Sequence, residues 1–176
     1  MSISEREFWT VLHGLGVGTI FLLAFAGGFA GLWSLRPEWV TAAGVQERLR
    51  RLIAGTWIMA IVAWLTVITG TYIVYPWYRA KPPAGADLSQ FPRSYLLASP
   101  NLAAWHTFGM EWKEHVAWLS PILATAVAYI VVRYGARLAN EEKIRQALMV
   151  LFTLAFFAAG VAGLFGAFIN KVAPIR

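Results

Sequence analysis

Four long apolar segments constrain the fold of this chain more than any other feature. They cover about residues 8–35, 52–75, 115–134 and 147–169. A helix needs about 20 mostly apolar residues to cross the ~30 Å hydrocarbon core of a bilayer, and each segment meets this length. The sequence therefore predicts an all-α integral membrane protein. We expect one membrane domain over residues 1–176, a four-transmembrane-helix bundle with an outer loop at 76–114.

Composition agrees with a membrane location. Hydrophobic residues make up 59% of the chain and charged residues only 14%, whereas a soluble domain carries about a quarter charged residues. The first apolar segment is too long for a signal peptide, and acidic residues precede it, so we interpret it as a retained span. The chain has no cysteine, which excludes disulfides, thiolate metal ligands and c-type haem attachment.

The cations predict the orientation. Eleven of the fifteen are arginines, most of them near the ends of apolar segments, so the net charge of +6 indicates lipid contact and not nucleic acid. The short loops between the first and second spans and between the third and fourth carry them most densely. The positive-inside rule then places both termini outside, in the cell inner (plasma) membrane.

The outer loop contains five prolines, at 76, 82, 83, 92 and 100, and this predicts an extended rather than helical conformation. Tryptophan and tyrosine cluster on the same side of the membrane. An aromatic belt at the headgroup level explains most of them, although one or two could stack on a cofactor.

All three histidines fall toward the outer side. Counted at 1.5 Å per residue from the inner helix ends, His13 and His115 differ in depth by only ~4–5 Å. His106 lies about 13 Å above His115, and a continuous helix would place these two on opposite faces. His13 and His115 are therefore the expected cross-helix pair, and His106 is the outlier. Ionisable residues in a membrane are a functional hypothesis by default.

Facing imidazoles suit the axial ligation of haem b. Gly14 and Gly16 beside His13 would let the flat macrocycle approach the backbone. Arg79 and Arg93, with Lys113, would neutralise the haem propionates. The alternative for the glycines is helix packing, because Gly14 and Gly18 also form a G-x-x-x-G pattern. The alternative for His13 is a hydrogen bond to a neighbouring helix.

The span number, His13, His115 and the glycine-lined first helix loosely resemble small four-helix membrane cytochromes of the b type. Such proteins anchor respiratory dehydrogenases and pass electrons to or from quinone. The resemblance covers the general plan of the chain and no specific motif. It implies one haem b between His13 and His115 near the outer face, a possible quinone, and membrane or periplasmic redox subunits as partners. Many such cytochromes draw their ligands from deeper in the spans than His115.

A protein-bound metal is a further alternative. Glu111 and His115 share one helix face, with Glu114, His106 and His13 nearby, and nitrogen with carboxylate oxygen suits zinc, copper or iron. The spans offer no further carboxylates to complete such a site. We expect Glu111 instead to orient His115 as a partner of a ligand, or to pair with a nearby cation in water.

Nothing in the sequence indicates nucleophilic or phosphoryl-transfer catalysis, and no paired carboxylates within the spans indicate a proton-coupled transporter. Two functions remain. The first is a redox subunit of an oxidoreductase complex, not catalytic alone. The second is a non-catalytic membrane anchor or assembly subunit with structural histidines. Under either function we expect a hetero- or homo-oligomer.

Overall fold

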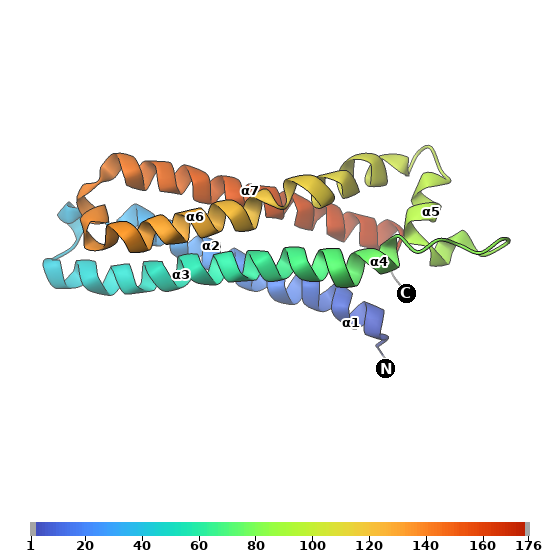
Figure 1. Cartoon of the computed structure of the whole chain (residues 1–176), viewed down its shortest axis with the longest axis horizontal. Coiled ribbons are helices and arrows are strands. Elements are labelled where there is room, and N and C mark those ends of the chain that lie inside the picture. Colours follow the sequence, from blue (N-terminus) through green and yellow to red (C-terminus); the bar gives the residue numbers. More distant parts are fainter. Residues whose placement is uncertain (1–2, 175–176) are drawn as a thin grey trace. The chain divides into compact units, whose positions relative to one another are not determined.

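The computed structural model describes residues 3–174, and Figure 1 labels its helices in chain order. The α-helices are α1 (Glu5–Val11), α2 (Val17–Ser34), α3 (Ala42–Thr69), α4 (Tyr75–Tyr78), α5 (Pro92–Leu97), α6 (Leu119–Tyr134) and α7 (Glu142–Val172). Four π-helical turns lie between them, at Leu12–Gly16, Gly70–Val74, Trp105–Met110 and Trp112–Val116. Short 3-10 turns occupy Pro37–Trp39, Leu88–Gln90 and Gly135–Asn140. The described residues contain no strand.

The predicted fold class is confirmed. Four continuous helical segments are long and apolar enough to cross a membrane: Glu5–Ser34, Ala42–Tyr78, Trp105–Asn140 and Glu142–Val172. The first begins where Ser4 caps the helix, because its hydroxyl accepts a hydrogen bond from the Glu7 amide and the Glu7 carboxylate accepts one from the Ser4 amide. This reciprocal capping box satisfies two amides that the first turn leaves without a helical partner.

The segments are longer than the apolar runs that predicted them. The helix from Trp105 begins ten residues before the predicted start of the third span, because hydropathy marks where a helix is apolar and not where it begins. Pro76 does not end the second segment; it is the second residue of α4 and directly follows the π-helical turn Gly70–Val74. Pro92 likewise begins α5, so the loop is helical there and not extended.

The chain divides into two compact units. Unit 1 contains the described residues 3–18, 65–118 and 159–174, and unit 2 contains residues 19–64 and 119–158. Each long segment therefore contributes to both units. In unit 1, α1 and the last turns of α7 lie at the same end as α4, and the loop after α4 leads out to α5 (Figure 1).

Unit 1 has a hydrophobic cluster that holds the outer loop against the helix ends. Its buried members are Tyr78, Leu96, Met110, Ile169 and Ala173. Leu96 on α5 is fully buried, so α5 covers the ends of α4 and α7 instead of extending into solvent. The absence of a side chain at Gly109 permits this close packing, because a Cβ there would lie 3.3 Å from the Phe165 ring.

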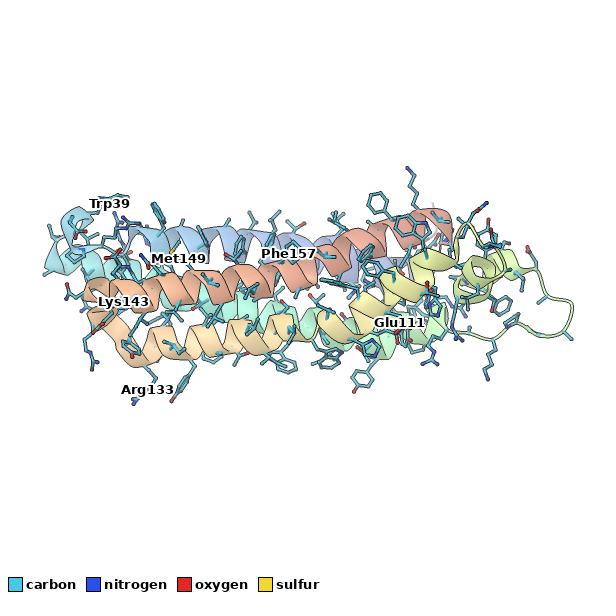
Figure 2. The ribbon with its side chains drawn as sticks, turned by 90° about the horizontal axis from the view of Figure 1, so that it is seen from above. Trp39, Glu111, Arg133, Lys143, Met149 and Phe157 are labelled. Carbon is cyan, nitrogen blue, oxygen red and sulfur yellow. The ribbon has the colours of Figure 1, made fainter. Side chains whose placement is uncertain are left out.

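Unit 2 is held by stacked phenylalanines from α2 and α7. The rings of Phe25 and Phe156 are parallel within 12°, with their centroids 4.0 Å apart. One end of unit 2 carries Trp39, Arg133 and Lys143 (Figure 2). This is the end that carries the two short, arginine-rich links between spans.

Candidate functional site in unit 1

The four π-helical turns all lie in unit 1, and all three histidines of the chain lie in them. A π-helical turn adds one residue to an α-helix and bonds each amide to the carbonyl five residues before it. Such turns are rare, and they occur frequently at functional sites. Their coincidence with the histidines selects this part of unit 1 as the candidate site.

His13 contacts the second span. Its Nδ1 lies 3.0 Å from Oγ1 of Thr69, and the Thr69 hydroxyl donates its own hydrogen to the Leu65 carbonyl at 2.7 Å. In the neutral ring, Nδ1–H must therefore be the donor to Thr69, which leaves the lone pair on Nε2. Gly70 makes this approach possible, because a Cβ there would lie only 2.9 Å from Cε1 of His13.

Lys113 is a cation that interacts with this histidine. Its ammonium is close enough to interact electrostatically with His13, and it donates a hydrogen bond to the Ala162 carbonyl at 3.1 Å. Gly166 on α7 gives it room, because a Cβ there would lie 2.8 Å from Nζ. Lys113 therefore reaches across to α7, so its ammonium is already hydrogen-bonded within unit 1 and is not free as an outward-facing anion ligand.

His106 is buried, with only 7% of its surface exposed. Its Nδ1 lies 2.9 Å from the Tyr78 hydroxyl, and its Nε2 accepts a hydrogen bond from Nε of Arg93 at 3.3 Å. Because Arg93 can only donate, Nδ1 carries the hydrogen and donates to Tyr78. Both nitrogens of His106 are thus committed to protein partners. The sequence identified His106 and Arg93 but did not indicate that Tyr78 joins them.

His115 lies on the surface of unit 1. Its side chain is 70% exposed, and its Nδ1 donates to the Glu111 carbonyl at 3.0 Å. The Glu111 carboxylate is 3.5 Å from the same nitrogen, and Figure 2 shows Glu111 on the helical segment that precedes α6. Because the carbonyl can only accept, the neutral ring carries its lone pair on Nε2. Glu111 thus fixes the orientation of His115.

The remaining predicted residues have separate environments. The Arg79 guanidinium lies 5.3 Å from the ring centre of Tyr75. Gly14 is exposed, with nothing within 4 Å of a Cβ built on it, whereas a Cβ on Gly16 would lie 3.2 Å from Leu12. Neither glycine is in close contact with another span, so neither is explained by tight helix packing within this chain.

One carboxylate in the site is unusual. Oε1 of Glu114 is buried and has no hydrogen-bond partner among the described residues. The Glu114 carboxylate and the Arg79 guanidinium both lie close enough to the Tyr75 side chain to interact with it electrostatically. An unsatisfied buried acceptor is costly, so this group belongs to the candidate site, whereas the sequence indicated it only as a neighbour of a possible metal site.

Within residues 3–174, no three histidine, aspartate or glutamate side chains gather closely enough to hold a metal ion. The arrangement instead offers two imidazole nitrogens with available lone pairs, on His13 and His115, and a third imidazole that is fully hydrogen-bonded. Comparisons with protein-family models, curated proteins and solved structures gave no match.

Proposed function

We propose that the chain is a membrane electron-transfer subunit that binds one haem b through His13 and His115. It would pass electrons to or from quinone or a partner redox subunit. The hydrogen-bonding states of the three histidines carry the proposal. His13 and His115 each donate through Nδ1, so each keeps a lone pair on Nε2, whereas both nitrogens of His106 are occupied.

This donor chemistry fits haem ligation. Histidines that bind a metal commonly donate the other ring N–H to a carbonyl, carboxylate or similar acceptor, which fixes the tautomer and makes the ligand more basic. Thr69 and Glu111 supply these acceptors. When bound, the haem would supply a one-electron carrier.

The arginines of the outer end suit the same proposal. Arg93 uses only its Nε on His106, and a guanidinium has further N–H donors for a carboxylate. Arg79 is exposed beside Tyr75. We propose that these two arginines hold the haem propionates. In the predicted orientation, both lie on the outer side of the cell inner membrane.

A second function is favoured by the position of Lys113. Its ammonium lies near His13, and Lys113 precedes His115 by two residues. Residues two positions apart on a helix point in nearly opposite directions, so His115 is directed away from the side that faces His13. This arrangement suits a non-catalytic anchor or assembly subunit, in which His13 and His106 join helices and His115 meets a partner subunit.

A reduced-minus-oxidised visible spectrum separates the two functions. The protein is expressed with an ample supply of haem, purified in detergent and compared with His13→Ala, His115→Ala and His106→Ala variants. Size-exclusion chromatography and circular dichroism establish that each variant is folded. The haem proposal predicts a b-type band that the first two substitutions abolish and that His106→Ala retains.

The other outcomes are equally informative. A folded wild-type protein with no b-type band would exclude the haem proposal and favour the anchor. A band that only His106→Ala abolishes would show that Tyr78 and Arg93 do not keep this imidazole from iron, and that the ligand assignment is wrong. If only one of the substitutions His13→Ala and His115→Ala abolishes the band, the second haem ligand comes from another residue or from a partner subunit.

A further inference from the structure

A groove in unit 2 has the character of a lipid site and takes no part in the proposed function. It has a volume of about 840 Å³ and lies open along the last turns of α2 and the first turns of α3. This volume is within the usual range for small-molecule sites, about 300–1,000 Å³. Its lining changes from apolar at one end to cationic at the other.

The apolar part is formed where side chains are absent. Nothing lies within 4 Å of a Cβ built on Gly27, so the space beside this residue is open. Gly31 faces Leu52, whose Cδ1 would lie 3.1 Å from a Cβ at that position. Ala30 also lines this stretch. The result is an apolar stretch of the groove that is open beside Gly27 and bordered by Leu52 beside Gly31.

The cationic end lies at the helix ends. Arg48 donates Nη1 to the Ser34 carbonyl at 2.8 Å, which holds its guanidinium at the groove and leaves further N–H donors. Arg51 also lines the groove. It pairs with the exposed carboxylate of Glu47 at 2.8 Å, so its charge is partly balanced.

The aromatic residues indicate the depth of the cationic end of the groove in the membrane. Trp33 lines the groove, and the guanidinium of Arg36 lies 4.3 Å from the Trp33 ring centre and 5.0 Å from that of Trp39. Tryptophan and arginine at the end of a span lie at the headgroup level of the bilayer. Cations there meet phosphates, while the apolar stretch beside Gly27 lies deeper in the hydrocarbon.

We propose that this groove binds one anionic phospholipid, with an acyl chain beside Gly27 and Gly31 and the phosphate on Arg48 and Arg51. Charge complementarity favours a lipid over a transmembrane helix of a partner. A helix lying in the groove would cover the arginines without an anion to satisfy them, and buried unpaired charge is costly. The four arginines at 36, 48, 50 and 51 exceed the two carboxylates of Glu38 and Glu47, so an anionic headgroup is favoured over a zwitterionic one.

Native mass spectrometry of the full chain in detergent tests the proposal. The protein is titrated with dioleoyl phosphatidylglycerol or dioleoyl phosphatidylcholine, and the first bound lipid is quantified. We expect phosphatidylglycerol to be preferred. Because a basic residue near the surface contributes ~1 kcal/mol to anionic-lipid binding, Arg48→Gln and Arg51→Gln should each weaken this preference ~5-fold. Arg50→Gln is the matched control, since Arg50 does not line the groove.

A second pair of variants tests the apolar stretch. Gly27→Leu fills open space within the groove and should reduce binding of both lipids. Gly163→Leu adds the same bulk on α7 at a position that is also exposed and open, and it should leave binding unchanged.

Three results would overturn the proposal. One is an equal loss of the phosphatidylglycerol preference in Arg50→Gln and Arg48→Gln, which indicates only a diffuse attraction between the arginines and anionic lipid. Another is unchanged binding of the first lipid by folded Gly27→Leu protein. The third is displacement of the lipid by millimolar inorganic phosphate, which would show that the arginines bind a free anion and that the apolar stretch contributes nothing.

Discussion

The Tyr78 hydroxyl lies 2.9 Å from Nδ1 of His106, and this buried hydrogen bond joins the end of the second span to the start of the third. Tyr78 is 1% exposed and His106 7% exposed, so water does not replace the bond if it is broken. Arg93 bonds the other ring nitrogen. The three side chains therefore connect two helices with the loop that covers them.

The first prediction concerns this bond. Tyr78→Phe keeps the ring but leaves the His106 N–H buried without an acceptor, which costs about 1–3 kcal/mol. The variant should unfold at lower temperature or denaturant concentration in detergent, with the tertiary signal of unit 1 lost first. Tyr72→Phe is the control, because Tyr72 is 71% exposed. Equal stability of the two variants would show that the hydrogen bond contributes nothing.

The second prediction concerns Gly70 and His13. A Cβ on Gly70 would lie 2.9 Å from Cε1 of the His13 ring, so Gly70→Ala should displace the ring and weaken its bond to Thr69. Overpacking of this kind typically costs about 1–3 kcal/mol. In a His13→Ala background the same substitution should cost much less, because the ring is gone. Unfolding of both single variants and the double variant measures this coupling.

If the stability losses of Gly70→Ala and His13→Ala simply add in the double variant, the two residues are not in contact. The cycle is also independent of haem. It tests whether His13 lies against the second span, whereas the visible spectrum tests what His13 binds.

The helices could be predicted from the sequence because crossing a bilayer imposes a strong length and hydropathy requirement. The four π-helical turns could not. One extra residue in a helix changes no hydropathy average, yet it rotates every later residue relative to those before it. A fixed rotation of 100° per residue therefore could not predict the helix face on which His115 lies relative to His106.

His106 illustrates a second limit. Its depth along the span could be counted from the sequence, but its burial depends on the outer loop. Pro92 begins α5 and does not extend the chain, and Leu96 of α5 packs into the unit 1 cluster. Tyr78 then meets His106 beneath this cover. No local pattern connects residues 78, 93 and 106, because their contact is a product of tertiary packing.

The third prediction compares two adjacent glycines in α2. A Cβ on Gly28 would lie 2.7 and 2.8 Å from two carbons of the buried Phe152 ring, and this ring is enclosed by other side chains. Gly28→Ala should destabilise unit 2 by about 1–3 kcal/mol. Gly27→Ala meets nothing within 4 Å, and alanine favours helix over glycine by up to about 1 kcal/mol. It should therefore leave stability unchanged or slightly higher.

Denaturant unfolding of the two variants, followed by circular dichroism, is the measurement. A Gly28→Ala protein as stable as Gly27→Ala would mean that α2 and α7 do not approach as closely at this point as the Phe152 contact requires.

The fourth prediction concerns the link between α6 and α7. Arg145 is only 7% exposed, and its guanidinium donates to the Leu138 carbonyl at 3.0 Å and to the Ala139 carbonyl. These carbonyls lie in the short helical turn Gly135–Asn140. A basic side chain can satisfy carbonyls that a helix end leaves without partners.

Arg145→Met retains most of the aliphatic packing but removes the charged donors. The Ala139 carbonyl loses this partner, and the Leu138 carbonyl keeps only the bond from the Glu141 amide. Because hydrogen bonds to charged groups contribute about 1.5–3 kcal/mol, we expect a loss of that order in the free energy of unfolding. Hydrogen exchange at residues 135–141 should rise with it. Lys143→Met is the matched control, since Lys143 is an exposed cation of the same link. If both variants lose stability equally, positive charge in the link is what matters, and the carbonyl contacts of Arg145 do not hold the turn.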